Sequence, residues 1–399
     1  MRIITKKIDK RISIFEDTYY GILAYDKDNL YPQNIVRICS GSGTAVSCQE
    51  MHQDFLFGEG FEKYGDRIVN AKHKLTLDKL LERLAFDFSY FFGFALHINY
   101  NANFKIHSIK HIPFEYCRLG RPDDSDVVGK IAVYNNWDRK YQKKLNKNHI
   151  AHIDIFNPDP DIIKYQVIKA GGWKNYKGQV YWYSNAGDYV YPPSPFDSVL
   201  EEVETDSKIQ LYKYRSVINS FSAGHMLVWR GQFETTQDEI DFEEDLKKFM
   251  GAENAGSVFL VQLDFDEQEP ELKKFEQFNT DKLFSYTEKS IQDNIRKRKK
   301  IPPVLIGDLI VGRLGTAEEI LDATILYNAF TKKDRKLLTE TLQELLSLYK
   351  TPIRGQLKIK ELSIIDELML AKRSKQESRS IEAGGGNTDG NDNDTEEGK

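Results

Sequence analysis

The chain has little cysteine: Cys39, Cys48 and Cys117 are the three among its 399 residues. Three cysteines cannot form a disulfide framework, and their spacing is not that of a zinc site. A reducing compartment is the simple interpretation. Long hydrophobic runs are also missing, since the most apolar stretch, 88–96, is too short to span a bilayer. The first residues lack the apolar stretch of a signal peptide. The sequence therefore favours neither a disulfide-stabilised secreted protein nor a membrane protein.

The motifs that bind nucleotides are absent too. Glycine-rich stretches at 41–44 and 58–60 lack the Lys and Ser/Thr of a Walker motif, and neither lies in a βαβ unit with the expected acidic residue downstream. A turn or a close backbone approach explains these glycines better. We therefore expect no nucleotide and no other cofactor.

One polar cluster is a candidate metal site. His149, His152 and Asp154 follow one another at every second or third position, and the last two would share a face of a strand. No further ligand is clustered beside them, so a strand with a polar outer side is the favoured interpretation. A metal-dependent hydrolase that uses these three residues stays open as an alternative.

What the chain does contain is an ordinary soluble composition, 40% hydrophobic and 29% charged, with a net charge of −5. This charge argues against a general nucleic-acid coat, although a protein that lets DNA pass without gripping it is compatible with it. The sequence pattern of residues 1–194 predicts an α+β domain. Its expected helices cover 34–48 and 75–87, and its expected strands cover 94–100, 130–134, 149–156 and 179–184.

Long helices dominate the rest of the sequence. Ser194 and Pro195 suit a helix start, and apolar residues then recur at helical spacing, so a first helix of about 40 Å is expected. The predicted parts, in order, are a first stem helix at 195–223, a small module at 224–279, a second stem helix at 280–303, a loop at 304–315, a long helix at 316–350, a C-terminal segment at 351–375 and a disordered acidic tail at 376–399.

The break after the second stem helix is the most informative feature. Pro302 and Pro303 must stop the helix, because proline removes a backbone donor and constrains the preceding residue. Thr316 and Glu319 match a capping box, and the helix that they open would span roughly 50 Å. The link before it carries three glycines and several apolar residues: Gly307, Asp308, Leu309, Ile310, Val311, Gly312, Arg313, Leu314 and Gly315. Two long helices joined in this way suggest a mechanical element of an extended assembly.

A basic run precedes the break. It consists of Arg296, Lys297, Arg298, Lys299 and Lys300. Cations at a helix C-terminus favour the macrodipole, so the run could simply be solvated. The alternative is that these residues line a path for DNA, and the sequence by itself supports both interpretations equally.

The ordered set of parts resembles the portal proteins of tailed bacteriophages. The segments on which this resemblance rests are Leu30-Tyr31-Pro32-Gln33-Asn34, Gly58-Glu59-Gly60-Phe61, Ser194-Pro195-Phe196, Gly251-Ala252-Glu253-Asn254-Ala255-Gly256 and Pro302-Pro303-Val304-Leu305-Ile306-Gly307. Together they cover about residues 30–370 in the family's order of wing, stem, clip, stem, tunnel loop and long helix.

This resemblance implies a closed ring, typically a dodecamer, at one vertex of a virion capsid and assembled in the host cytoplasm. Double-stranded DNA would enter and leave through it, and terminase, a head–tail adaptor and a major capsid or scaffolding protein would be partners. No catalytic activity is implied. Arg296 to Lys300 and Arg313 would face DNA, residues 307–315 would form the tunnel loop, and the acidic Glu243, Glu244 and Asp245 would dock a partner on the clip. A non-portal tail or adaptor component is the rival structural interpretation.

Overall fold

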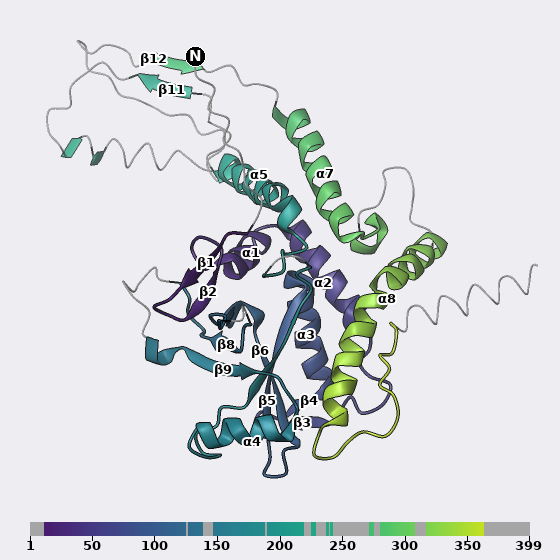
Figure 1. The fold of residues 1–399 in the computed structure, drawn as a ribbon. Helices are drawn as coiled ribbons and strands as arrows, with labels where there is room; N and C mark the ends of the chain where they lie inside the picture. Colours follow the sequence, from purple (N-terminus) through teal and green to yellow (C-terminus); the bar gives the residue numbers. More distant parts are fainter. Residues whose placement is uncertain are drawn as a thin grey trace, which may run out of the picture. The chain divides into compact units, whose positions relative to one another are not determined.

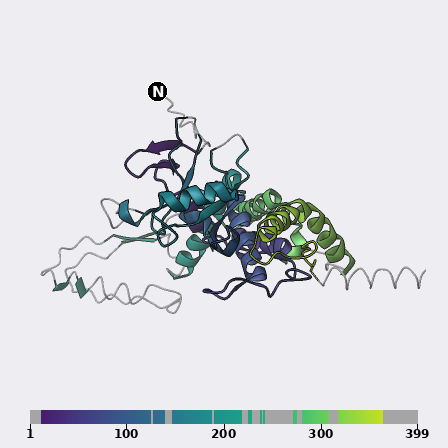
Figure 2. The ribbon, with the colours of Figure 1, turned by 60° about the horizontal axis from the view of Figure 1, so that its bottom comes forward.

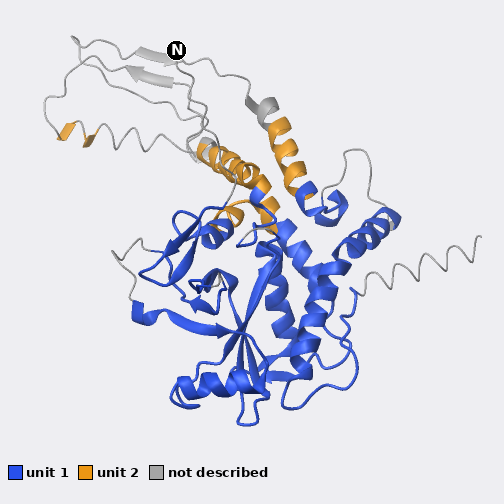
Figure 3. Ribbon diagram, in the orientation of Figure 1, with its two compact units in different colours: residues 1–36, 47–197, 297–399 blue, residues 37–46, 198–296 orange. Residues whose placement is uncertain are grey.

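The computed structural model describes residues 12–124, 127–138, 147–187, 190–218, 225–228, 237–238, 240–241, 271–274, 280–307 and 317–362 (Figures 1 and 2). The protein is a mixed α+β fold, as the sequence predicted. It divides into two compact units (Figure 3). Unit 1 comprises residues 1–36, 47–197 and 297–399, and unit 2 comprises 37–46 and 198–296.

Unit 1 is built on a six-stranded sheet with the order β6-β5-β10-β9-β8-β7. Its neighbouring strands are antiparallel except for β10 and β9, which run parallel. The strands are β5 (Gly93–Tyr100), β6 (Ile106–Ile112), β7 (Cys117–Leu119), β8 (Lys130–Val133), β9 (Ala151–Ile155) and β10 (Gln179–Ser184). Each of the four strands expected from the sequence is therefore present, with its bounds within two residues.

Helices α3 (Leu77–Phe91), α4 (Pro160–Lys169) and α8 (Ala317–Ser347) contribute to one hydrophobic core with this sheet. Helix α3 begins after Thr76, whose side chain accepts a hydrogen bond from the Lys79 amide, and it is followed by Phe92 in the left-handed region. Leucines recur at three- and four-residue steps along α3 and α8, which is why these faces are buried. The buried leucines are Leu77, Leu80, Leu81 and Leu84 of α3 and Leu338, Leu342, Leu345 and Leu346 of α8.

A hairpin of β1 (Ile14–Asp17) and β2 (Ile22–Tyr25) precedes α1 (Tyr31–Cys39). Tyr25 lies in a stack of three rings, with centroids 3.9 Å from Tyr191 and 4.9 Å from Tyr31. The hydroxyl of Tyr31 donates to Asp197 at 2.7 Å, and that of Tyr191 donates to the Leu23 carbonyl at 2.7 Å. These contacts fix the proline-rich segment 191–195 to the N-terminal hairpin.

Beside the ring stack lies the fully buried Arg118, and within the described part of the chain none of its hydrogen-bond partners is a carboxylate. Burial is the main cause that lowers its pKa, to about 10. Its guanidinium donates instead to the Asn29 side chain and carbonyl, the Gln33 side chain and the carbonyls of Glu115 and Cys117, at 2.6–3.0 Å.

The glycines at 58–60 mark a close backbone approach. Gly58 and Gly60 have φ values of 60° and 82°, which glycine adopts without strain. The Glu59 amide donates to the Lys360 carbonyl at 2.9 Å, and the Lys360 amide donates to Gly60 at 2.8 Å. The C-terminal segment is thereby attached next to β3 (Ile68–Asn70), β4 (Leu75–Thr76) and the end of α2 (Gly43–Phe57). This agrees with the structural role expected for these glycines.

Unit 2 contains α5 (Leu200–Ile218), most of α7 (Thr280–Lys299) and the short antiparallel strands β11 (His225–Val228) and β12 (Glu271–Lys274). Glu288 of α7 accepts a hydrogen bond from Gln210 of α5 at 2.7 Å and forms an ion pair with Lys213. The helix that was expected to start at Pro195 begins instead at Leu200. Ser194 donates to the Tyr90 carbonyl and accepts from the Phe196 amide, and a short 3₁₀ turn, Asp197–Val199, intervenes.

Among the described residues, no helix is both long and apolar enough to cross a bilayer.

Candidate functional site

The basic run lies at the C-terminal end of α7, where the chain changes direction. Helix α7 ends at Lys299, and Lys300 follows with a left-handed φ of 58°. Pro302 is extended, and a short 3₁₀ turn, Pro303–Ile306, closes on Gly307 at φ 80°. Helix α7 must end here because of Pro302, which cannot continue the helix and excludes the helical conformation at Ile301.

The five cations of the run occupy two environments. Arg296 and Lys299 are buried, whereas Lys297, Arg298 and Lys300 are exposed. Arg296 forms an ion pair with Asp293 one turn earlier in the helix. Within the basic run, the three exposed cations are therefore the ones available to a ligand of the isolated subunit, and the DNA-facing role of the run stays a prediction.

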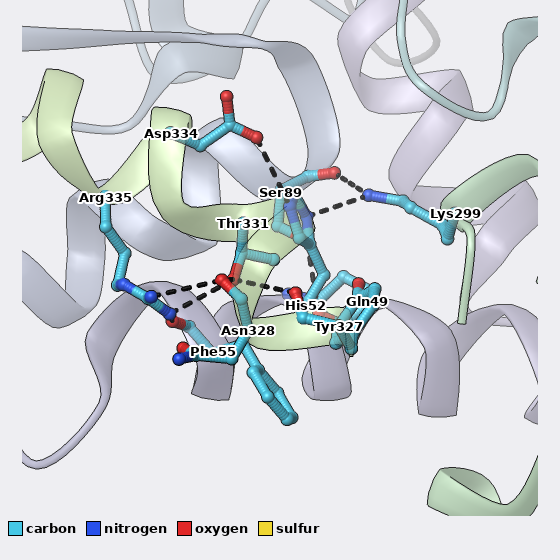
Figure 4. A network of polar contacts seen from close by, with 10 residues as sticks. All are labelled: Gln49, His52, Phe55, Ser89, Lys299, Tyr327, Asn328, Thr331, Asp334 and Arg335. Carbon is cyan, nitrogen blue, oxygen red and sulfur yellow. Dashed lines mark hydrogen bonds and ion pairs between the residues drawn. The ribbon is translucent and has the colours of Figure 1, made fainter. Parts of the chain in front are cut away.

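Lys299 reaches into a polar network between helices of unit 1 (Figure 4). Its ammonium donates to the Ser89 carbonyl of α3 at 2.5 Å and to Nδ1 of His52 of α2 at 3.3 Å. It also lies 4.7 Å from the centre of the Phe196 ring. A buried ammonium requires such partners, because an unpaired charge inside a protein is costly. The contacts attach the last turn of α7 to α2 and α3.

His52 connects this lysine to α8. Burial, and secondly the Lys299 charge, lower the pKa of His52 to about 4. The imidazole is therefore neutral at pH 7, and its Nδ1 must be the acceptor, because an ammonium has only donors. The ring proton is then on Nε2, which faces Asp334 of α8 with 3.8 Å between Nε2 and Oδ2. The chain of contacts therefore joins α7 to α8.

Arg335, the next residue of α8, binds the other side of the same network. Its guanidinium donates to the Phe55 carbonyl at 2.9 Å, to Thr331 at 3.1 Å and to the Asn328 carbonyl at 3.2 Å. Glu361 forms an ion pair with it at 3.6 Å. Helix α8 is thus fixed to α2 by polar contacts here and by the leucine core farther along.

Several predicted site residues lie outside the described part of the chain. These are Asp308, Leu309, Ile310, Val311, Gly312, Arg313, Leu314 and Gly315 of the expected tunnel loop, and Glu243, Glu244 and Asp245 of the expected docking face. Their roles stay predictions. Gly307, at the edge of the loop, is described and exposed.

The alternative metal site finds no counterpart in the described residues, which contain no group of three or more His, Cys, Asp and Glu side chains able to hold a metal ion. His152 and Asp154 lie on β9, and Asp154 is 4.0 Å from the Lys130 ammonium. Burial, followed by the Lys130 charge, lowers the pKa of His152. A strand with polar side chains accounts for these observations.

The sequence patterns did not identify the partners of the basic run, although the helical spacing indicated which of its side chains are buried. Lys299 continues the spacing of Ile291 and Ile295, both buried, at four-residue steps. Arg335 is likewise in phase with Leu338 and Leu342. A cation on the apolar stripe of a helix is expected to be buried and paired, and this phase would have identified both residues.

No protein-family model matches the sequence, and no curated protein matches it either. Solved structures are similar over most of the chain. A chain from the virion of a native gene transfer agent (GTA) particle is 16% identical, with a TM-score of 0.48, over 90% of this chain and 91% of that chain. A chain from the neck of the native GTA particle, computed with C12 symmetry, is 14% identical, with a TM-score of 0.48, over 87% and 88%.

An HK97-family phage portal protein from Corynebacterium diphtheriae is also similar. It is 9% identical, with a TM-score of 0.40, over 77% of this chain and 88% of that chain.

Proposed function

We propose that this chain is a portal subunit, which assembles into a closed ring at one vertex of a capsid and forms the passage for double-stranded DNA. The observation that carries the proposal is the end of α7. The buried Lys299 fixes this helix end to the core of unit 1, and three exposed cations follow its surface at the entry to the predicted loop. DNA that passes through the ring would therefore meet a rigidly held cluster of positive charge.

The charges suit passage better than tight binding. Each subunit offers Lys297, Arg298 and Lys300 in a chain whose net charge is −5. Neutralised phosphates release counterions, so a few cations per subunit give attraction that depends strongly on salt. Repeated around a ring, they would form a narrow belt with no base-specific contacts. DNA could then slide past, because phosphate contacts carry no sequence information.

The remaining parts have proposed roles that complete this function. Residues 307–315, with Arg313, form the tunnel loop, and the two stem helices carry the clip module 224–279. We propose that Glu243, Glu244 and Asp245 on this module attract the terminase and later the head–tail adaptor, since acidic surfaces accelerate encounter with basic partners. The terminase supplies the work of packaging, and a major capsid or scaffolding protein surrounds the ring. The resemblance implies that the ring is a dodecamer.

The proposal is tested by ring assembly and DNA retention in matched variants. The triple change Lys297→Gln, Arg298→Gln and Lys300→Gln should leave rings intact and weaken the retention of DNA, with a smaller dependence on salt. Replacing three exposed lysines elsewhere in unit 1, Lys72, Lys74 and Lys79, with glutamine is the control. A purified chain that remains a monomer at micromolar concentration would exclude the portal function.

A further inference from the structure

Helix α4 has an apolar side that the core of unit 1 does not cover. It buries Ile163 and Val167, which pack into the core, yet Ile162, Tyr165 and Ile168 are 38%, 61% and 68% exposed. Their spacing of three residues places them along one side of the helix. Helix α4 lies at the surface of unit 1 in both views of the ribbon (Figures 1 and 2). Exposed apolar side chains that gather along one side of a helix suggest an interaction site.

The loop after α4 extends this surface and is held in place. Trp173 is 40% exposed, and its ring lies 6.0 Å from that of Phe104 and 5.9 Å from that of Tyr176. The Tyr176 hydroxyl donates to the Gln166 side chain at 3.0 Å. The Gly172 amide donates to the Val167 carbonyl at 2.9 Å. Because the loop is already ordered by these contacts, a partner would have little chain to immobilise.

The charge of the surface is mainly positive, although the exposed Asp159 and Asp161 stand at the start of α4. Residues 162–178 include four lysines, Lys164, Lys169, Lys174 and Lys177, and no Asp, Glu or Arg. All four lysines are exposed, and the Lys169 ammonium lies 5.8 Å from the centre of the Tyr165 ring. We call Ile162, Lys164, Tyr165, Ile168, Lys169 and Trp173 the α4 face.

We propose that the α4 face docks an acidic segment of a second protein, one in which carboxylates flank two or three apolar side chains. This inference rests on the proposed function, because it assumes that the second protein is a component of the same capsid particle. Lysines around an apolar centre give charge complementarity to such a segment and place the hydrophobic contact in the middle of the interface.

Other occupants fit the α4 face less well. A second copy binding through its own α4 face would bring lysines against lysines. Nucleic acid would use the cations and aromatic rings, but it would leave the aliphatic Ile162 and Ile168 without a partner. A membrane surface usually engages a longer amphipathic helix than the ten residues of α4.

The test is site-specific photocrosslinking in assembled particles. A benzophenone amino acid is placed at position 168, and in a control protein at position 127, because Val127 is also exposed, at 58%. Mass spectrometry of the crosslinked peptide identifies the occupant. We expect position 168, and not position 127, to crosslink to a peptide of another protein with net negative charge and apolar residues.

Charge reversal provides the second measurement. Lys164→Glu together with Lys169→Glu should lower the crosslink yield at position 168 by roughly tenfold, whereas Lys72→Glu with Lys74→Glu should not. Ring formation, examined first by microscopy, separates this inference from the proposed function. Intact rings with no specific crosslink, or with a crosslink to a second copy, nucleic acid or lipid, would overturn the docking inference alone. Failure to form rings would count against the portal function.

Discussion

The buried His52 makes the stability of unit 1 depend on pH. Its pKa falls from 6.5 to about 4 on folding, chiefly through burial and then through the charge of Lys299. The unfolded chain therefore binds an additional proton between these values. The stabilisation is complete above pH 6.5 and is lost as the pH falls toward 4. For these two pKa values, the loss is ~2 kcal/mol at pH 5 and ~3 kcal/mol at pH 4.

The change His52→Gln isolates this contribution. Glutamine keeps an acceptor for Lys299 and a donor toward Asp334, but it does not titrate. Urea unfolding followed by tryptophan fluorescence, from pH 7.5 to pH 4.5, would give the free energy of unfolding of both proteins. Between pH 7.5 and pH 5 the natural protein should lose ~2 kcal/mol more than the variant.

Two further variants make the comparison decisive. His73→Gln changes an exposed histidine and should keep the pH profile of the natural protein. Lys299→Gln removes the cation that helps to lower the pKa of His52, so the pH dependence should become smaller without disappearing. If the profiles of the natural protein and His52→Gln ran parallel over this range, the lowered pKa of the buried His52 would be refuted.

Three other predictions concern particular sites. Gly58→Ala should destabilise unit 1 by at least ~2 kcal/mol in urea unfolding, because a Cβ at this left-handed position meets the carbonyl oxygen of Lys360. The control Gly43→Ala places its Cβ in open space and should be neutral or stabilising. Arg118→Lys should cost ~3 kcal/mol in the same assay, because an ammonium cannot replace the planar fork of donors; an unchanged unfolding midpoint would contradict this. Lys297→Gln with Arg298→Gln should reduce the salt dependence of DNA binding by rings, measured by filter retention from low to physiological salt, and an unchanged slope would exclude these residues from the DNA path.

Much of the fold could be predicted from local patterns. The strands carry β-branched and aromatic residues between turn residues, so their positions are evident from the sequence alone. The expected helix over 34–48 is in fact two helices. Ser42 separates them, since its hydroxyl accepts from the Ala45 amide and starts α2. A glycine-serine pair inside an apolar pattern was the available signal for this break.

The buried network could not be predicted in the same way. His52, Ser89, Lys299 and Asp334 come from four helices or helix ends that are far apart in sequence, and no local pattern specifies which of them meet. Helical phase indicates that Lys299 is buried, but the identity of its partners depends on tertiary packing. The sequence analysis therefore treated the five cations of the run alike, whereas Arg296 and Lys299 are buried in the structure.

The most direct test of the central claim is an electron cryomicroscopy reconstruction of the purified chain at micromolar concentration. The account predicts a closed ring with a continuous central channel, in which Lys297, Arg298 and Lys300 at the end of α7 face the channel. A monodisperse monomer would contradict the account, as would a ring in which these three cations face outward, away from the channel.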